Sequence, residues 1–175
     1  EKKNFKFFHL GPARDIGLFK DFEILKQDKP EKADYILCTG LYDEKENLEF
    51  YKDLLSSLKD KEMVCTNPDL IVDRGDIREY CAGSVAKVFE ELGGKVKYFG
   101  KPYPLVYQKS TEVKNKRILC IGDNLNTDIR GANIQSFNSL FILNGIHKNE
   151  KNYELNKLFD KYQVHVDYIQ EKLKW

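Results

Sequence analysis

The segment of this sequence that is best suited to binding or catalysis carries two aspartates after an apolar run. Asp123 follows the run 118–121, and Asp128 comes five residues later. Ligands of open α/β sheets bind beyond the carboxyl ends of the strands, where a strand over 118–121 would deliver Asp123. Carboxylate and amide oxygens suit Mg²⁺, so the segment indicates a metal site. A helix cap at Asn126 or Thr127, with Asp128 favouring the helix dipole, explains part of the pattern as well.

Two further strand ends carry polar groups. Lys101 follows the run 96–99. A lysine there can reach a phosphoryl oxygen or orient a carboxylate, and the alternative is an ordinary surface lysine. Asn67 and Asp69 follow the run 63–65. They either face a ligand or form an Asx turn that closes the strand.

The elements that would position these residues alternate along the chain. Compact apolar runs predict strands at 5–10, 35–38, 63–66, 96–99, 117–121 and 139–143. Helical spacing predicts helices at 14–22, 47–59, 81–92, 104–109, 127–134, 152–162 and 168–173. In the first helix we expect Ile16, Leu18, Phe19 and Phe22 to point inward, and Gly93 to end the third. Such alternation predicts an α/β, Rossmann-like fold with a mainly parallel sheet covered on both faces.

Three segments together resemble the haloacid-dehalogenase (HAD) superfamily, specifically its class IIA phosphatases. Residues 66–69 (TNPD) are similar to the cap element of that group, and residues 100–102 (GKP) to its third core motif. Residues 122–129 (GDNLNTDI) are similar to the fourth motif, usually GDxLxTDI. The resemblance extends from about Phe5 to the C-terminus, and the three motifs occur in the family's order.

The resemblance implies a Mg²⁺-dependent phosphate monoester hydrolase that works through an aspartyl-phosphate. It implies Lys101 as the catalytic lysine and Asp123 as a direct metal ligand. Asp128 would belong to the metal site as well, holding water or the lysine in place. Asn67 and Asp69 would contact the substrate, a small organic phosphate such as a sugar phosphate or a nucleotide.

One departure from the family pattern is large. The first motif, a DxD run after an N-terminal strand, is absent, and so is the second motif, a Ser or Thr at the end of the next strand. We therefore expect the nucleophile segment to lie before Glu1 and this polypeptide alone to be inactive. Residues 73–80 also depart from the glycine- and proline-rich stretch common in the family. The alternative is a non-catalytic HAD-like binding or regulatory module that has lost its nucleophile; a receiver-like protein fits the motifs less well.

The resemblance also divides the chain. Residues 1–32 are expected to be a core segment, 33–98 an α/β cap domain, and 99–175 the C-terminal half of an incomplete HAD-like core. A core without its first strands would expose a sheet edge and apolar surface.

Composition excludes several other classes. The formal net charge is +1 and 41% of residues are apolar, which gives no reason to expect nucleic acid or a membrane as partner. The four cysteines, Cys38, Cys65, Cys81 and Cys120, lack CxxC spacing, which argues against a zinc site. Three of them, Cys38, Cys65 and Cys120, lie in apolar runs, which favours buried thiols in strands and a reducing, cytoplasmic setting. The histidines have no metal spacing and receive no role: His9, His147 and His165. The oligomeric state stays open, with a homo-oligomer allowed.

Overall fold

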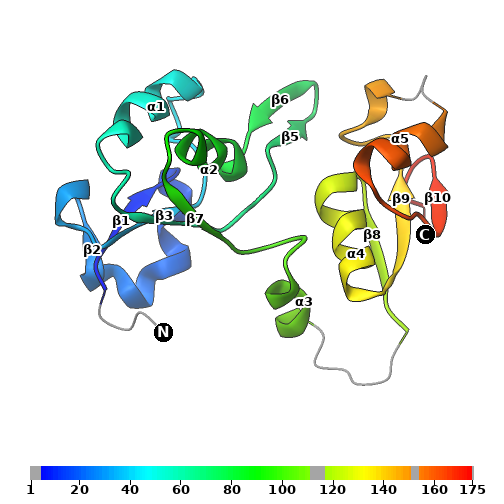
Figure 1. Ribbon diagram of the computed structural model, residues 1–175, viewed down its shortest axis with the longest axis horizontal. Coiled ribbons are helices and arrows are strands. Elements are labelled where there is room, and N and C mark those ends of the chain that lie inside the picture. The colour runs from blue at the N-terminus through cyan, green and yellow to red at the C-terminus, as the bar shows by residue number, and fades with distance from the viewer. Residues whose placement is uncertain (1–4, 111–116, 151–153, 175) are drawn as a thin grey trace. The chain divides into compact units, whose positions relative to one another are not determined.

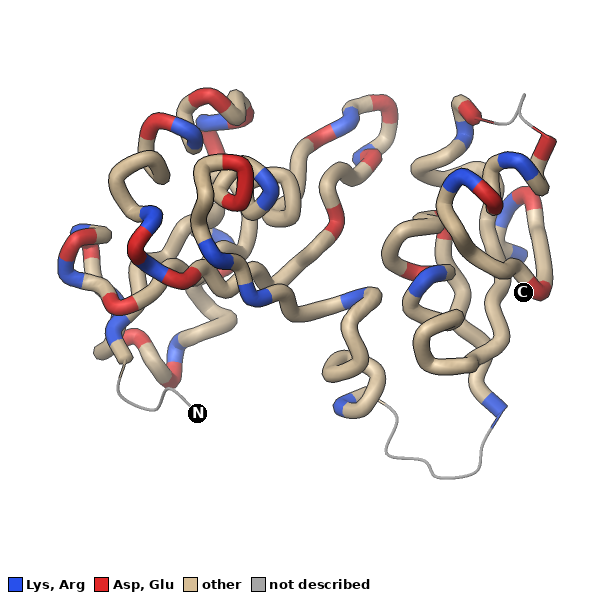
Figure 2. The backbone as a smooth tube through the Cα atoms, in the orientation of Figure 1, with Lys and Arg blue, Asp and Glu red and all other residues tan. Residues whose placement is uncertain are grey.

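The computed structural model describes residues 5–110, 117–150 and 154–174, and the chain divides into two compact units, 1–99 and 100–175. Each unit has its own parallel sheet, so the expected α/β class is confirmed (Figure 1). Acidic and basic residues are interspersed along the backbone of both units (Figure 2). Within the described part of the chain, no helix is long and apolar enough to cross a membrane.

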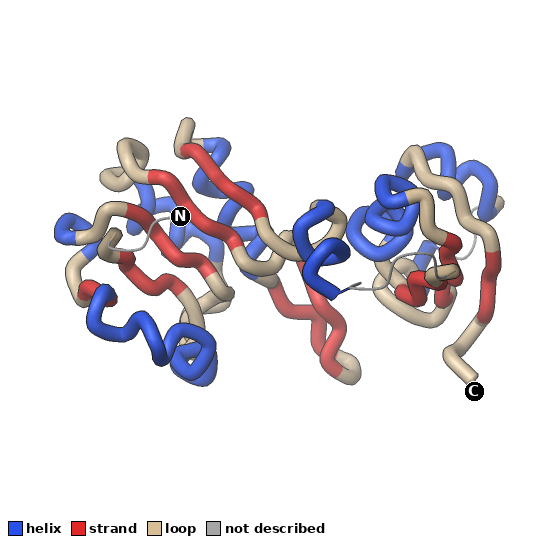
Figure 3. The backbone as a smooth tube through the Cα atoms, turned by 90° about the horizontal axis from the view of Figure 1, so that it is seen from below, coloured by secondary structure: helices blue, strands red, loops and turns tan. Residues whose placement is uncertain are grey.

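The first unit is built on a five-stranded parallel sheet with the order β2-β1-β3-β4-β7. Its strands lie side by side in Figure 3. They are β1 (Phe7–Leu10), β2 (Lys26–Gln27), β3 (Tyr35–Cys38), β4 (Glu62–Cys65) and β7 (Lys95–Tyr98). An antiparallel hairpin, β5 (Ile71–Arg74) and β6 (Ile77–Tyr80), was not foreseen from the sequence.

Helices α1 (Leu48–Ser56) and α2 (Ala82–Glu91) cover one face of this sheet (Figure 1). Tyr51 and Leu55 of α1 and Phe89 of α2 are fully buried against strand residues such as Ile36 and Met63. Burial of each such side chain contributes about 1.5–3 kcal/mol, which fixes the helices to the sheet. The glycine that ends α2, Gly93, has φ +89°, as expected for a helix C-cap.

The other face is covered by a 3₁₀ segment, η1 (Ala13–Leu25), in place of the predicted α-helix. Phe19 is buried and stacks edge-on against Phe7, with ring centroids 5.2 Å apart. Leu18 and Phe22 are 73% and 57% exposed, so the predicted inward stripe is wrong. A 3₁₀ helix has about three residues per turn, and a kink at Phe19 breaks the segment, so positions spaced for an α-helix do not share a face.

The described part of residues 1–32 is built into the first unit. β1 pairs along its whole length with β3, from Phe7 opposite Tyr35 to Leu10 opposite Cys38. A second 3₁₀ turn, η2 (Pro30–Lys32), leads directly into β3. The structure thus places the segment expected to be core in one sheet with residues 35–98. The division of a complete enzyme into cap and core stays a prediction.

The second unit has a three-stranded parallel sheet with the order β10-β9-β8. Its elements, in chain order, are α3 (Pro104–Ser110), β8 (Leu119–Gly122), the π-helical turn η3 (Leu125–Ile129), α4 (Arg130–Gln135), β9 (Asn138–Ile142), η4 (Lys148–Glu150), α5 (Leu155–Tyr162) and β10 (Tyr168–Gln170). Leu125, Ile129, Phe141 and Leu158 form its core. Leu119 and Ile121 on β8 are 47% and 39% exposed.

Two helix predictions in this unit need correction. The helix expected over 168–173 is strand β10, which pairs with β9 through Tyr168–Leu140 and Gln170–Ile142. Pairing with a neighbouring strand satisfies its backbone groups and overrides the local spacing. The helix expected from 127 begins two residues earlier, at Leu125, and its N-cap is Asn124. The predicted start of α5 at Asn152 lies outside the described residues.

Candidate active site

The turn after β8 holds both predicted aspartates. Asp123 follows the last strand residue, and the side chain of Asn124 caps η3 by accepting a hydrogen bond from the Asn126 amide at 2.9 Å. This cap replaces the one expected from Asn126 or Thr127. Asp128 is buried, and its Oδ2 accepts from the backbone amide of Asn124 at 3.1 Å. A side chain at Gly122 would overlap the Asp128 carboxylate, so glycine is required there.

Lys101 reaches this turn from the start of the second unit. Its Nζ donates to Oδ1 of Asp128 at 2.5 Å. The Asp128 side chain is 9% exposed and the Lys101 side chain 47% exposed, so the carboxylate is nearly buried while the ammonium stays accessible. An accessible ammonium that is held in place by a buried carboxylate can bind a phosphoryl oxygen without losing its orientation.

Asp123 is held by the segment that follows β9. Its Oδ2 accepts from the backbone amide of Ile146 at 2.9 Å. Gly145 packs so closely that a side chain there would overlap the Asp123 carboxylate. Among the described residues, Oδ1 of Asp123 has no hydrogen-bond partner. One oxygen is therefore fixed and the other can serve a ligand.

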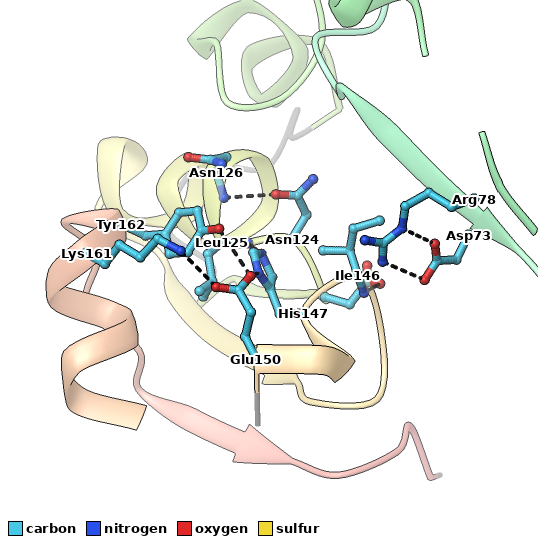
Figure 4. A network of polar contacts seen from close by, with 11 residues as sticks. Asp73, Arg78, Asn124, Leu125, Asn126, Ile146, His147, Glu150, Lys161 and Tyr162 are labelled. Atoms are coloured by element: carbon cyan, nitrogen blue, oxygen red, sulfur yellow. Dashed lines mark hydrogen bonds and ion pairs between the residues drawn. The ribbon is translucent and has the colours of Figure 1, made fainter. Parts of the chain in front are cut away.

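The segment that follows β9 contributes a partly buried polar network (Figure 4). The ring of His147 interacts with the backbone amide of Leu125 through Nε2 and with Glu150 through Nδ1. Burial acts to raise the pKa of Glu150, but hydrogen bonds from His147 and Lys161 outweigh it and leave that pKa below its usual range. Neither His147 nor Gly145 was expected to matter. Their position just beyond a predicted strand, at the same sheet edge as Asp123, was the available signal.

Asn67 and Asp69 belong to the first unit. The Asn67 side chain accepts from the Asp69 amide at 3.2 Å, so the Asx turn that was the alternative to ligand binding does form. Asn67 also lines a cavity of about 410 Å³ bordered by the loops after β1, β3 and β4 and by the hairpin β5–β6. Asp69 is not among the residues that line it.

That cavity lies where the chain order of the sheet reverses. The connection from β1 leads to β2 on one side, and the connection from β3 leads to β4 on the other. Such a switch point leaves a crevice at the carboxyl ends of the strands, which is where α/β folds bind ligands.

The possible metal donors at this turn are Asp123 and Asp128. In residues 5–110, 117–150 and 154–174, no three His, Cys, Asp or Glu side chains gather to hold an ion. Asp123 fits a hard cation because its Oδ1 is available. Both oxygens of Asp128 are already engaged, by Lys101 and by Asn124, which suits a residue that holds the lysine.

Comparisons with known proteins identify a related family and fold. Residues 98–174 match the sequence profile of a family described as HAD-hydrolase-like. No curated protein matches the chain at a significant level.

Solved structures give a broader likeness. A hydrolase of the haloacid dehalogenase-like family from Brucella suis 1330 has a TM-score of 0.75 and 32% identity, over 83% of this chain and 60% of that chain. The p-nitrophenyl phosphatase from Archaeoglobus fulgidus has a TM-score of 0.69 and 20% identity, over 98% of this chain and 66% of that chain. A possible sugar phosphatase from Cytophaga hutchinsonii has a TM-score of 0.68 and 18% identity, over 98% of this chain and 66% of that chain. The chain thus spans 60–66% of the length of these proteins.

Proposed function

Because the chain belongs to the haloacid-dehalogenase-like family, we propose that it forms part of a Mg²⁺-dependent hydrolase of small phosphate monoesters. The observation that carries this proposal is the Lys101–Asp128 pair at the carboxyl end of β8, in the turn that also carries Asp123. A cation and carboxylates at one strand end match what phosphoryl transfer needs, which is mainly positioning and charge stabilisation.

Each residue has a distinct task in this proposal. Lys101 contacts a phosphoryl oxygen and offsets its charge while Asp128 keeps the ammonium in place. Asp123 offers Oδ1 to the metal ion while Ile146 holds Oδ2. Mg²⁺, when bound, supplies further positive charge to the phosphoryl oxygens.

The attacking group is proposed to come from outside this sequence. Attack by an aspartate, with a second carboxylate two residues later as general acid and base, needs a DxD pair. No two aspartates in the 175 residues are separated by a single residue. We therefore propose that the 175-residue polypeptide alone does not turn over a phosphate ester.

The substrate class is proposed from the first unit. Asn67 and the switch-point cavity that it lines suit the organic part of a sugar phosphate or nucleotide, and Asp69 is a further candidate contact. The Archaeoglobus and Cytophaga proteins are described as a p-nitrophenyl phosphatase and a possible sugar phosphatase, which supports a small ester.

The test is phosphate release by the natural full-length protein from p-nitrophenyl phosphate, sugar phosphates and nucleoside monophosphates, with Mg²⁺ or with a chelator. We expect Mg²⁺-dependent turnover that falls about 100-fold or more in Asp123→Asn. The exposed Asp160→Asn is the matched control and should retain full activity. Full activity of Asp123→Asn would contradict the proposal.

A second candidate is a non-catalytic HAD-like binding module. The absence of a DxD pair from this sequence favours it. In that case the full-length protein would bind phosphate esters without releasing phosphate, under the same assay conditions.

A further inference from the structure

His147 is a buried histidine with a defined partner for each ring nitrogen. It is 7% exposed, and its ring packs edge-on against Tyr162 with centroids 4.9 Å apart. Nε2 lies 3.3 Å from the backbone nitrogen of Leu125, and Nδ1 lies 2.7 Å from Oε1 of Glu150. Nothing in the proposed reaction uses this residue directly.

The partners determine where the proton of the ring is. A backbone amide can only donate, so Nε2 must accept from Leu125 and carry no hydrogen. Nδ1 then carries the proton and donates it to the Glu150 carboxylate. The histidine therefore satisfies the first free amide of η3, a group that the helix itself leaves without a partner.

Glu150 is in turn fixed to helix α5. Its Oε2 accepts from Lys161 at 3.0 Å, and its Oε1 accepts from the Tyr162 hydroxyl at 3.3 Å (Figure 4). The segment after β9 is thus attached to two elements, η3 through Leu125 and α5 through Glu150.

The same segment holds Asp123. Ile146, the residue before His147, donates its backbone amide to Asp123, and Gly145 packs against that carboxylate. A movement of His147 would move Ile146 with it, because adjacent Cα atoms are a fixed 3.8 Å apart. The orientation of Asp123 thus depends on a side chain that never touches it.

We propose that His147 and Glu150 are positioning residues that fix the Gly145–Ile146 segment and thereby keep Oδ1 of Asp123 turned toward a divalent cation. This inference rests on the proposed function. Removing a residue that orients a metal ligand typically lowers the metal affinity about 10–100-fold.

The experiment measures Mn²⁺ binding to the full-length protein by calorimetry, with activity and metal-free thermal unfolding as companion readouts. His147→Phe removes the hydrogen bonds to Leu125 and Glu150 but keeps an aromatic ring at this position. It should raise the Kd for Mn²⁺ about 10–100-fold. His147→Gln, which can still accept from Leu125, should recover part of the loss. Excess Mg²⁺ should restore the activity of both variants, which a general loss of packing would not allow.

The control is His9→Phe. His9 is also 7% exposed and also bonded to a side chain, Thr39 at 2.9 Å, but it lies in the first unit. The His9→Phe variant should be less stable than the wild type but bind Mn²⁺ with unchanged affinity. If His147→Phe does not fold, Glu150→Ala decides the matter, and it too should raise the Kd.

The outcomes distinguish the positioning role of His147 and Glu150 from the proposed metal site at Asp123. If Asp123→Asn abolishes Mn²⁺ binding while the folded His147 and Glu150 variants bind within twofold of the wild type, the positioning role is refuted and the proposed function stands. If Asp123→Asn binds Mn²⁺ as the wild type does, the proposed metal site is wrong and the positioning role falls with it.

Discussion

The ammonium nitrogen of Lys101 lies 2.5 Å from Oδ1 of Asp128, although the two residues are 27 positions apart in the sequence. The lysine follows one strand of the chain and the aspartate follows another, so the fold alone makes them neighbours. Since Asp128 is nearly buried and also accepts from Asn124, its carboxylate is a rigid support for a more exposed cation.

The first prediction concerns this pair. In the full-length protein, Lys101→Met and Asp128→Asn should each lower kcat of the proposed reaction about 100-fold, because each removes or misplaces the same positive charge. The double variant should lose little more than either single one, since the residues act as a unit. Phosphate release across this cycle is the measurement. The exposed pair Glu154–Lys157, 3.1 Å apart, provides a matched control whose loss should leave kcat unchanged; independent, multiplying losses at Lys101 and Asp128 would contradict the pairing.

The second prediction concerns Gly145. Alanine at this position would overlap the Asp123 carboxylate and force it to turn. The Mg²⁺ concentration for half-maximal activity should rise about 10–100-fold. Gly17→Ala is the control, because a side chain there meets open space, and it should be neutral or stabilise the protein by about 0.4–1 kcal/mol. An unchanged metal requirement in Gly145→Ala would show that the close packing does not orient Asp123.

The third prediction concerns acid stability of the second unit. Hydrogen bonds from the Ser139 backbone and hydroxyl, together with His165, hold the pKa of Asp167 below its ordinary value of 3.8. A carboxyl whose folded-state pKa is depressed stabilises the fold above its ordinary pKa, and this contribution disappears as the pH falls through the folded-state value.

Asp167→Asn should therefore have a lower Tm than the wild type at pH 7, and the difference should narrow as the pH falls below about 3.8. Thermal unfolding followed by circular dichroism between pH 7 and about pH 3 measures this. Asp160→Asn, at an exposed site, should change stability by less than about 0.5 kcal/mol throughout. A Tm difference independent of pH would show that the charge of Asp167 does not matter.

The fourth prediction concerns the core of the first unit. The fully buried Tyr51 hydroxyl accepts from the Tyr42 amide at 2.7 Å and donates to the Lys45 carbonyl at 2.8 Å, and burial helps to raise its pKa to about 12. Tyr51→Phe leaves both backbone groups without this partner and should cost about 1–3 kcal/mol in urea unfolding. Tyr168→Phe, at a residue 56% exposed, should cost almost nothing. Equal effects would mean that the loop at residues 42–45 is held by other contacts.

Local pattern determined much of this fold. Apolar runs identified β3, β4 and β8, and helical spacing identified α1 and α2, because burial on a sheet or helix face imposes a period on the chain. The same reasoning failed at β10 and in η1. At β10, pairing with β9 decided the conformation, and in η1 a 3₁₀ winding changed which side chains share a face.

The sequence by itself also determined which residues could do chemistry, since Lys101 and Asp123 each come just after a predicted strand and both, together with Asp128, match motifs in order. The resemblance left Asp128 to hold either water or the lysine, and the tertiary structure shows the bond to the lysine. Only the tertiary structure placed the Ile146 amide on Asp123 and His147 against Leu125. These contacts depend on strand order and on the loops that the sheet brings to one edge, and the periodicity of a single segment carries no information about either.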